Sequence, residues 1–63
     1  MIERSDRAQE ALNAYAETTG EDDAPMDQVL TDLLADLMHW ARRERVDFHR
    51  ACQMADTHFQ SEG

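Results

Sequence analysis

The chain has 63 residues, of which fourteen are acidic and six are basic, and its formal net charge is −8. A chain of this size is at most one domain, and its small core often needs a partner, a metal ion or disulfides for stability. Because Cys52 is the sole cysteine, an internal disulfide is excluded, and the lack of any long apolar run excludes a membrane-spanning helix.

The distribution of charge bears on the partners of the chain. All six basic residues are arginine, and none lies between Arg7 and Arg42. This acidic tract would repel a phosphate backbone, so direct nucleic-acid binding is disfavoured, whereas a basic protein or a metal cation is easier to accept. Solubility alone also explains an acidic surface. One free cysteine and no signal-like N-terminus indicate a cytoplasmic protein without a membrane anchor.

The first predicted helix covers residues 5–18. Ser5 is expected as its N-cap, and Gly20 can end it. Its apolar residues are mostly alanine, so this face buries little area and the helix needs a larger neighbour. A glycine, three consecutive acids and the one proline then mark residues 19–24 as a linker.

The second predicted helix, residues 25–44, has the strongest periodic pattern of the chain. Asp23 is expected as its N-cap, with Pro25 in the first turn, where a missing N–H costs nothing. Arginines at its end suit the negative pole of the helix dipole. Its apolar sector is wider than one helix contact requires, which favours several partners, including a second copy of the chain.

The third predicted helix covers residues 47–61, with Asp47 as its N-cap. Because the preceding connection is short, the last two helices are expected to form an antiparallel αα-hairpin. The sequence thus predicts one all-α domain over residues 1–63, with three helices assembled as a dimeric bundle. The expected core and interface residues are Met26, Val29, Leu30, Leu33, Leu34, Leu37, Met38, Trp40, Phe48, Cys52 and Phe59.

Few residues are suited to catalysis. Cys52 lies on the apolar stripe of the third helix, where a thiol packs more often than it reacts, although His49 precedes it by three residues. No glycine-rich phosphate loop and no zinc-type spacing is present. We therefore expect a protein that is not an enzyme and that has no cofactor.

A divalent metal site is the one chemical alternative. Asp32 and Asp36 are four residues apart on a polar helix face, and two such carboxylates could hold Mg²⁺. Charged residues at this spacing are also common on solvated helix faces, where His39 or Arg43 would offset their repulsion. Both interpretations stay open.

The segment "DLLADLMHWARRERVDFHRACQMADTHF", residues 32–59, resembles the C-terminal half of the MazG-type all-α nucleoside triphosphate pyrophosphatases. In that family a helix with an Asp leads through Ala-Arg and Ile/Val-Asp to a helix with spaced alanines and a closing phenylalanine. The matching positions here are Asp32, Ala41, Arg42, Val46, Asp47, Ala51, Ala55 and Phe59. The chain also resembles small acidic helical proteins encoded in bacterial genomes and mobile elements.

The resemblance implies a shared helical scaffold and dimer assembly with the catalytic apparatus lost, because the metal motif of the family is incomplete. The family has an ExxE on a preceding helix and an ExxD here; Asp32 fits the last position, whereas Val29 replaces the Glu. The first helix offers no ExxE, and Arg45 replaces a turn glycine. A magnesium ion that polarises nucleotide phosphates would lack most of its carboxylate ligands.

Three functions follow from these patterns. The leading hypothesis is a non-catalytic interaction or accessory protein that forms a homodimer through its second helix. The second is a degenerate pyrophosphatase scaffold that binds Mg²⁺ or a nucleotide through Asp32 and Asp36. The third is an acidic nucleic-acid mimic that inhibits a nucleic-acid-binding protein.

Overall fold

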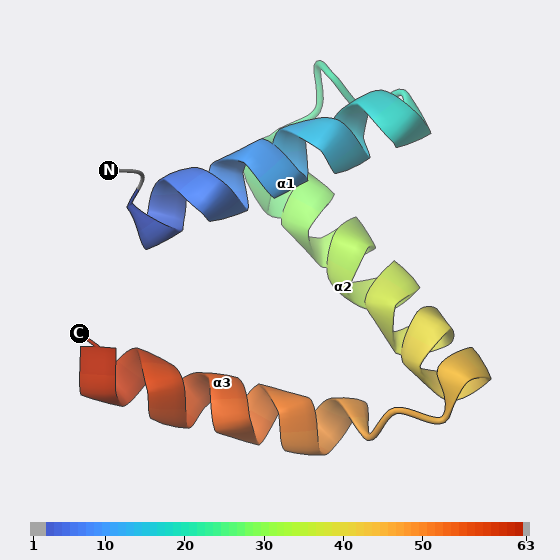
Figure 1. Ribbon diagram of the computed structural model, residues 1–63. Helices are drawn as coiled ribbons and strands as arrows, with labels where there is room; N and C mark the ends of the chain where they lie inside the picture. The colour runs from blue at the N-terminus through green and yellow to red at the C-terminus, as the bar shows by residue number, and fades with distance from the viewer. Residues whose placement is uncertain (1–2, 63) are drawn as a thin grey trace.

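The computed structural model describes residues 3–62, and these form three helices and no strand (Figure 1). Helix α1 is Arg4–Thr19, α2 is Met26–Glu44 and α3 is Phe48–Glu62. The all-α prediction is confirmed, and each observed bound lies within one residue of the predicted one.

Helix α1 begins one residue earlier and ends one residue later than predicted, and Gly20 ends it as expected. The Arg7 N–H donates to the carbonyl oxygen of Glu3 at 3.1 Å, so Ser5 lies inside the first turn and its expected role as N-cap is wrong. At the other end Gly20 has φ 78°, and Glu21 N–H donates to the carbonyl of Ala16 at 2.7 Å. This left-handed ending is the Schellman arrangement, which favours glycine.

The predicted N-cap of α2 is also wrong. The residue directly before the helix is Pro25, and Asp23 lies two residues further upstream. The carbonyl of Pro25 accepts the first helical bond, from Val29 N–H at 3.1 Å. The linker instead forms a turn, in which Ala24 N–H donates to the carbonyl of Glu21 at 2.9 Å.

The corner between α2 and α3 repeats the left-handed ending without a glycine. Arg45 has φ 59°, and Val46 N–H donates to the carbonyl of Ala41 at 2.8 Å. The chain then starts α3 at once, because Asp47 Oδ1 accepts the Arg50 N–H at 2.9 Å. The predicted N-cap Asp47 is therefore confirmed.

The three helices form an open, flat molecule. Figure 1 shows α1 crossing α2 and α3 diverging from the corner. The extents are 34 × 32 × 18 Å and the radius of gyration is 13.1 Å, whereas a compact domain of this length has a radius of about 11 Å. Among the described residues, only Ala16, Val29 and Ala41 are buried.

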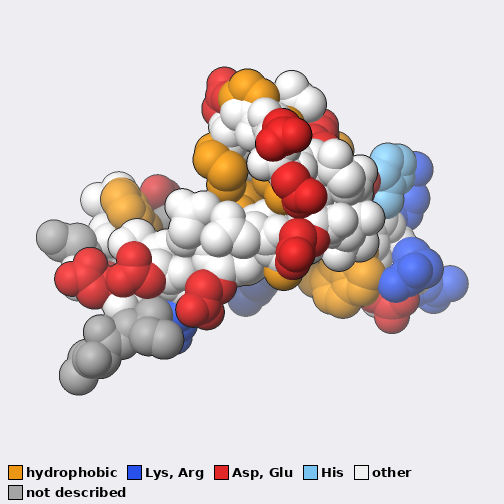
Figure 2. All heavy atoms as spheres, turned by 90° about the horizontal axis from the view of Figure 1, so that it is seen from above, with side chains coloured by type: hydrophobic (Ala, Val, Ile, Leu, Met, Phe, Trp, Pro, Cys, Tyr) orange, Lys and Arg blue, Asp and Glu red, His pale blue; other side chains and the backbone are white. Residues whose placement is uncertain are grey.

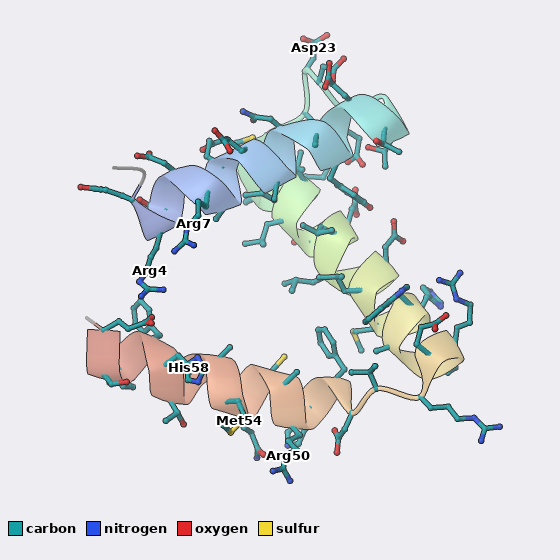
Figure 3. All side chains as sticks on the ribbon, viewed as in Figure 1. Arg4, Arg7, Asp23, Arg50, Met54 and His58 are labelled. Carbon is teal, nitrogen blue, oxygen red and sulfur yellow. The ribbon has the colours of Figure 1, made fainter. Side chains whose placement is uncertain are left out.

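The free ends of α1 and α3 approach each other on the side opposite the corner. Arg4 Nη2 lies 3.0 Å from Glu62 Oε2, and Figure 3 shows Arg4 pointing from α1 toward the end of α3. Both side chains are solvated, so this ion pair contributes at most about 1 kcal/mol. Within residues 3–62, every helix is too short or too polar to cross a membrane.

Candidate functional site

Most of the apolar side chains expected in a core or interface are uncovered in the single chain. Val29 is fully buried, and Leu33 and Phe48 are half-buried. The remaining expected residues are exposed: Met26, Leu30, Leu34, Leu37, Met38, Trp40, Cys52 and Phe59. We call the exposed residues Met26, Leu30, Leu34, Leu37 and Met38 the α2 stripe, because their spacing places them on one face of that helix.

Two of the three buried residues are alanines, and only Val29 is larger. Ala16 of α1 and Ala41 of α2 are buried, and neither was among the expected core residues. Each alanine also supplies the carbonyl that its Schellman ending uses. The small alanine side chain lets the chain pass closely over the helix end at these points. Such positions are not found by looking for large apolar residues.

A cluster of polar side chains lies where α1 meets α2. The Tyr15 hydroxyl donates a hydrogen bond to Asp36 Oδ2 at 2.5 Å. This bond, followed by weaker effects of desolvation and of nearby carboxylates, raises the pKa of Tyr15 from 10.0 to about 12. The phenol is held in its protonated form because loss of the proton would place two negative charges in contact.

Glu21 and Asp32 form the second part of this cluster. Glu21 Oε1 accepts a hydrogen bond from Thr19 Oγ1 at 2.7 Å, and together with a hydrogen bond from Asp32 this lowers the pKa of Glu21. Glu21 Oε2 is covered and has no hydrogen-bond partner among the described residues, while a weaker hydrogen-bond effect of Gln28 also lowers the pKa of Glu21. The hydrogen bond with Glu21, followed by desolvation and the negative charges of Glu21 and Asp36, raises the pKa of Asp32.

The two predicted metal ligands are thus engaged in different contacts, Asp32 with Glu21 and Asp36 with Tyr15. Among residues 3–62, no three His, Cys, Asp or Glu side chains gather as a metal site would require. The sequence pattern did not indicate Tyr15 and Glu21 as members of this cluster. The short linker was the available signal, because it places the last turn of α1 beside the early turns of α2.

A second surface feature is an open groove of about 610 Å³ at the corner. Cys52 lies in it and is exposed, rather than packed as its apolar position suggested. His49, also in the groove, is hydrogen-bonded along α3 to Gln53, with 3.3 Å between their Nε2 atoms. The lining residues are Ala35, Met38, His39, Ala41, Arg42, Val46, Phe48, His49 and Cys52.

Comparison with known proteins gives no relative. No family model, curated protein or solved structure matches this chain. The resemblance to the MazG-type pyrophosphatases therefore stays a prediction that rests on the residues quoted for it.

Proposed function

We propose that the chain is a non-catalytic helical interaction protein that completes its hydrophobic core by forming a homodimer. The observation that supports this proposal is the exposure of large apolar side chains on all parts of α2 and on α3. Phe59 is 70% exposed, Met38 is 58% exposed and Trp40 is 47% exposed. Soluble monomers rarely leave contiguous apolar surface uncovered to this extent.

The accessible area of the chain supports the same function. The single chain exposes 5528 Å², whereas a folded monomer of this mass exposes about 4,200 Å². If each of two copies covered the excess of roughly 1,300 Å², the interface would fall in the size range of obligate homodimers. One further copy is therefore sufficient to account for the excess.

The proposal includes the predicted antiparallel αα-hairpin of α2 and α3. In the single chain these helices contact each other near the corner, and α3 has no buried residue. A second copy would cover the apolar stripe of α3 and hold this helix against a neighbour. The acidic outer surface would then keep the dimer soluble.

Sedimentation of the purified chain at two concentrations tests the proposal. We expect a species of twice the 7.3 kDa monomer mass in the micromolar range. Leu30→Glu, which places a charge in the proposed interface, should weaken association by about tenfold or more. A wild-type chain that remains monomeric across this range would refute the homodimer.

Met54→Glu provides the matched control. Met54 is 48% exposed, close to the 46% of Leu30. Figure 3 shows it on the outer side of α3, away from α2. The same substitution there should leave the dissociation constant within about threefold of the wild type. An equal effect at both positions would mean that added charge, rather than the interface, controls association.

A further inference from the structure

Charge is divided along the length of α2. Its first two-thirds carry three acids and no base: Asp27, Asp32 and Asp36. Its last turn carries Arg42 and Arg43, and Arg45 follows directly. The linker before α2 adds three further acids in residues 21–23. On the face shown in Figure 2, most basic side chains gather at one edge, and acidic side chains lie across the middle and toward the opposite end.

Glu44 is the exception at the arginine end of α2, and it is already paired. Its Oε2 atom lies 2.7 Å from Arg43 Nε. Arg42 forms no ion pair with a carboxylate of the described residues. The arginine end therefore keeps a net positive charge that a second copy can meet.

We propose that two copies pair through the α2 stripe with their α2 helices antiparallel and with Leu34 next to the two-fold axis. This inference rests on the proposed homodimer and names its geometry. An antiparallel pair places the arginine end of each α2 against the acidic start of the other. A parallel pair would place arginines against arginines and acids against acids, which is destabilising.

The α2 stripe fits the same axis. A two-fold interface uses one surface patch on both copies, so residues equally far from the axis face each other. With the axis at Leu34, Leu30 of one copy faces Met38 of the other, and Leu34 faces its own counterpart. Leu34 lies near the middle of Met26–Glu44, so this register overlaps nearly the whole length of the two helices.

The charges at the two ends meet in this register. Arg42 of one copy lies opposite Met26 and beside Asp27 of the other. Arg45 then lies near the acidic linker, where Figure 3 shows Asp23 projecting from the molecule. The apolar stripe allows this register, and the charges at the two ends favour it over the neighbouring ones.

Disulfide cross-linking tests the geometry in two variants of a Cys52→Ser chain, Leu34→Cys and Met26→Cys. The two positions are matched, because Leu34 is 42% exposed and Met26 is 41% exposed. In the antiparallel pair the two copies of position 34 are adjacent, whereas those of position 26 lie about 24 Å apart. Since a disulfide requires Cα atoms within about 7 Å, Leu34→Cys should form a cross-linked dimer under mild oxidation and Met26→Cys should not.

Each other outcome has a distinct meaning. Efficient cross-linking at both positions would show a parallel pair and overturn the inference. No cross-linking at either position, with a dimer in sedimentation, would overturn the antiparallel stripe and leave the homodimer intact. A chain that sediments as a monomer would refute the proposed homodimer as well as its geometry.

Exchange of charges gives a second test that leaves the apolar stripe unchanged. Arg42→Asp and Asp27→Arg should each weaken association by about tenfold, because each places like charges opposite one another. The double variant restores opposite charges across the pair and should return the dissociation constant to within about threefold of the wild type. A double variant no tighter than the single variants would contradict the antiparallel register.

Discussion

Tyr15 is the residue whose chemistry depends most directly on the packing of two helices. Its hydroxyl reaches across from α1 to Asp36 of α2, and it is the single tyrosine of the chain. Its ultraviolet titration therefore reports on this contact without interference from another phenol. A loss of the contact between α1 and α2 would be visible as a change in one pKa.

We predict that Tyr15 titrates near pH 12 in the native chain and closer to 10 in Asp36→Asn. Because the folded-state pKa is raised, the contribution of this group to stability is present below pH 10 and is lost as the pH rises toward 12. Absorbance at the phenolate band measures both titrations. Asp27→Asn, which removes a carboxylate from the same helix outside this cluster, should leave the pKa of Tyr15 unchanged.

The pair of Glu21 and Asp32 gives a second prediction at this scale. The pKa of Asp32 is raised, so its contribution to stability is present at low pH and is lost as the pH rises through its folded-state value. The pKa of Glu21 is lowered, so its contribution is lost as the pH falls through its own value. The pair is therefore most favourable in mildly acidic solution, where it shares one proton.

Asp32→Asn should stabilise the chain at neutral pH, because its amide supplies at every pH the donor that Asp32 supplies only when protonated. Urea unfolding at neutral and at mildly acidic pH would measure this change. The variant should also show a smaller difference between the two conditions than the wild type. A variant less stable than the wild type at neutral pH would contradict the shared proton.

The sequence could indicate the polar cluster only in part. Asp32 and Asp36 stand out because their spacing is visible along one helix. Their partners Tyr15 and Glu21 lie on other segments, and the crossing of α1 over α2 decides which side chains meet. Ala16 of α1 and Val29 of α2 are buried, but the periodicity of one helix does not specify where another helix crosses it.

At the scale of the elements, two helix endings share one geometry but use different residues. Gly20 and Arg45 both have a positive φ, 78° and 59°. Glycine adopts this conformation without cost, whereas a residue with a Cβ atom loses about 1 kcal/mol or more. The corner between α2 and α3 is therefore a position where the chain stores backbone strain.

Arg45→Gly should stabilise the chain by about 1 kcal/mol, because it removes the strain of the left-handed conformation. Denaturant unfolding at a fixed protein concentration would measure this gain. Gly20→Ala is the reverse control: no atom lies within 4 Å of the added Cβ, so its expected loss comes from φ alone. A less stable Arg45→Gly would mean that the guanidinium, at the helix end or beside the acidic linker of the second copy, contributes more than the strain costs.

The elements themselves could be predicted well from the sequence. Periodicity located all three helices, and Gly20 and Asp47 act as expected. The starts at Ser5 and Asp23 were placed wrongly, because several acids and hydroxyls near each start can serve as caps and propensity does not choose between them. The left-handed Arg45 could not be foreseen, because arginine disfavours that conformation.

At the scale of the whole molecule, Trp40 reports on association. It is the single tryptophan and is about half exposed in the single chain. Burial of Trp40 in a dimer should shift its fluorescence to shorter wavelength as the protein concentration rises through the dissociation constant. Leu30→Glu should keep the longer-wavelength emission to higher concentration, and an emission that is independent of concentration in the wild type would argue against an interface at α2.

The open arrangement of the helices has a kinetic consequence. Nearly all residue contacts of the chain lie within single helices or between neighbours in sequence. Such contacts form within microseconds to milliseconds, because little chain must be closed into loops. If apolar burial is completed between copies, the rate-limiting step of folding is an encounter of two chains, and the observed refolding rate should rise in proportion to protein concentration.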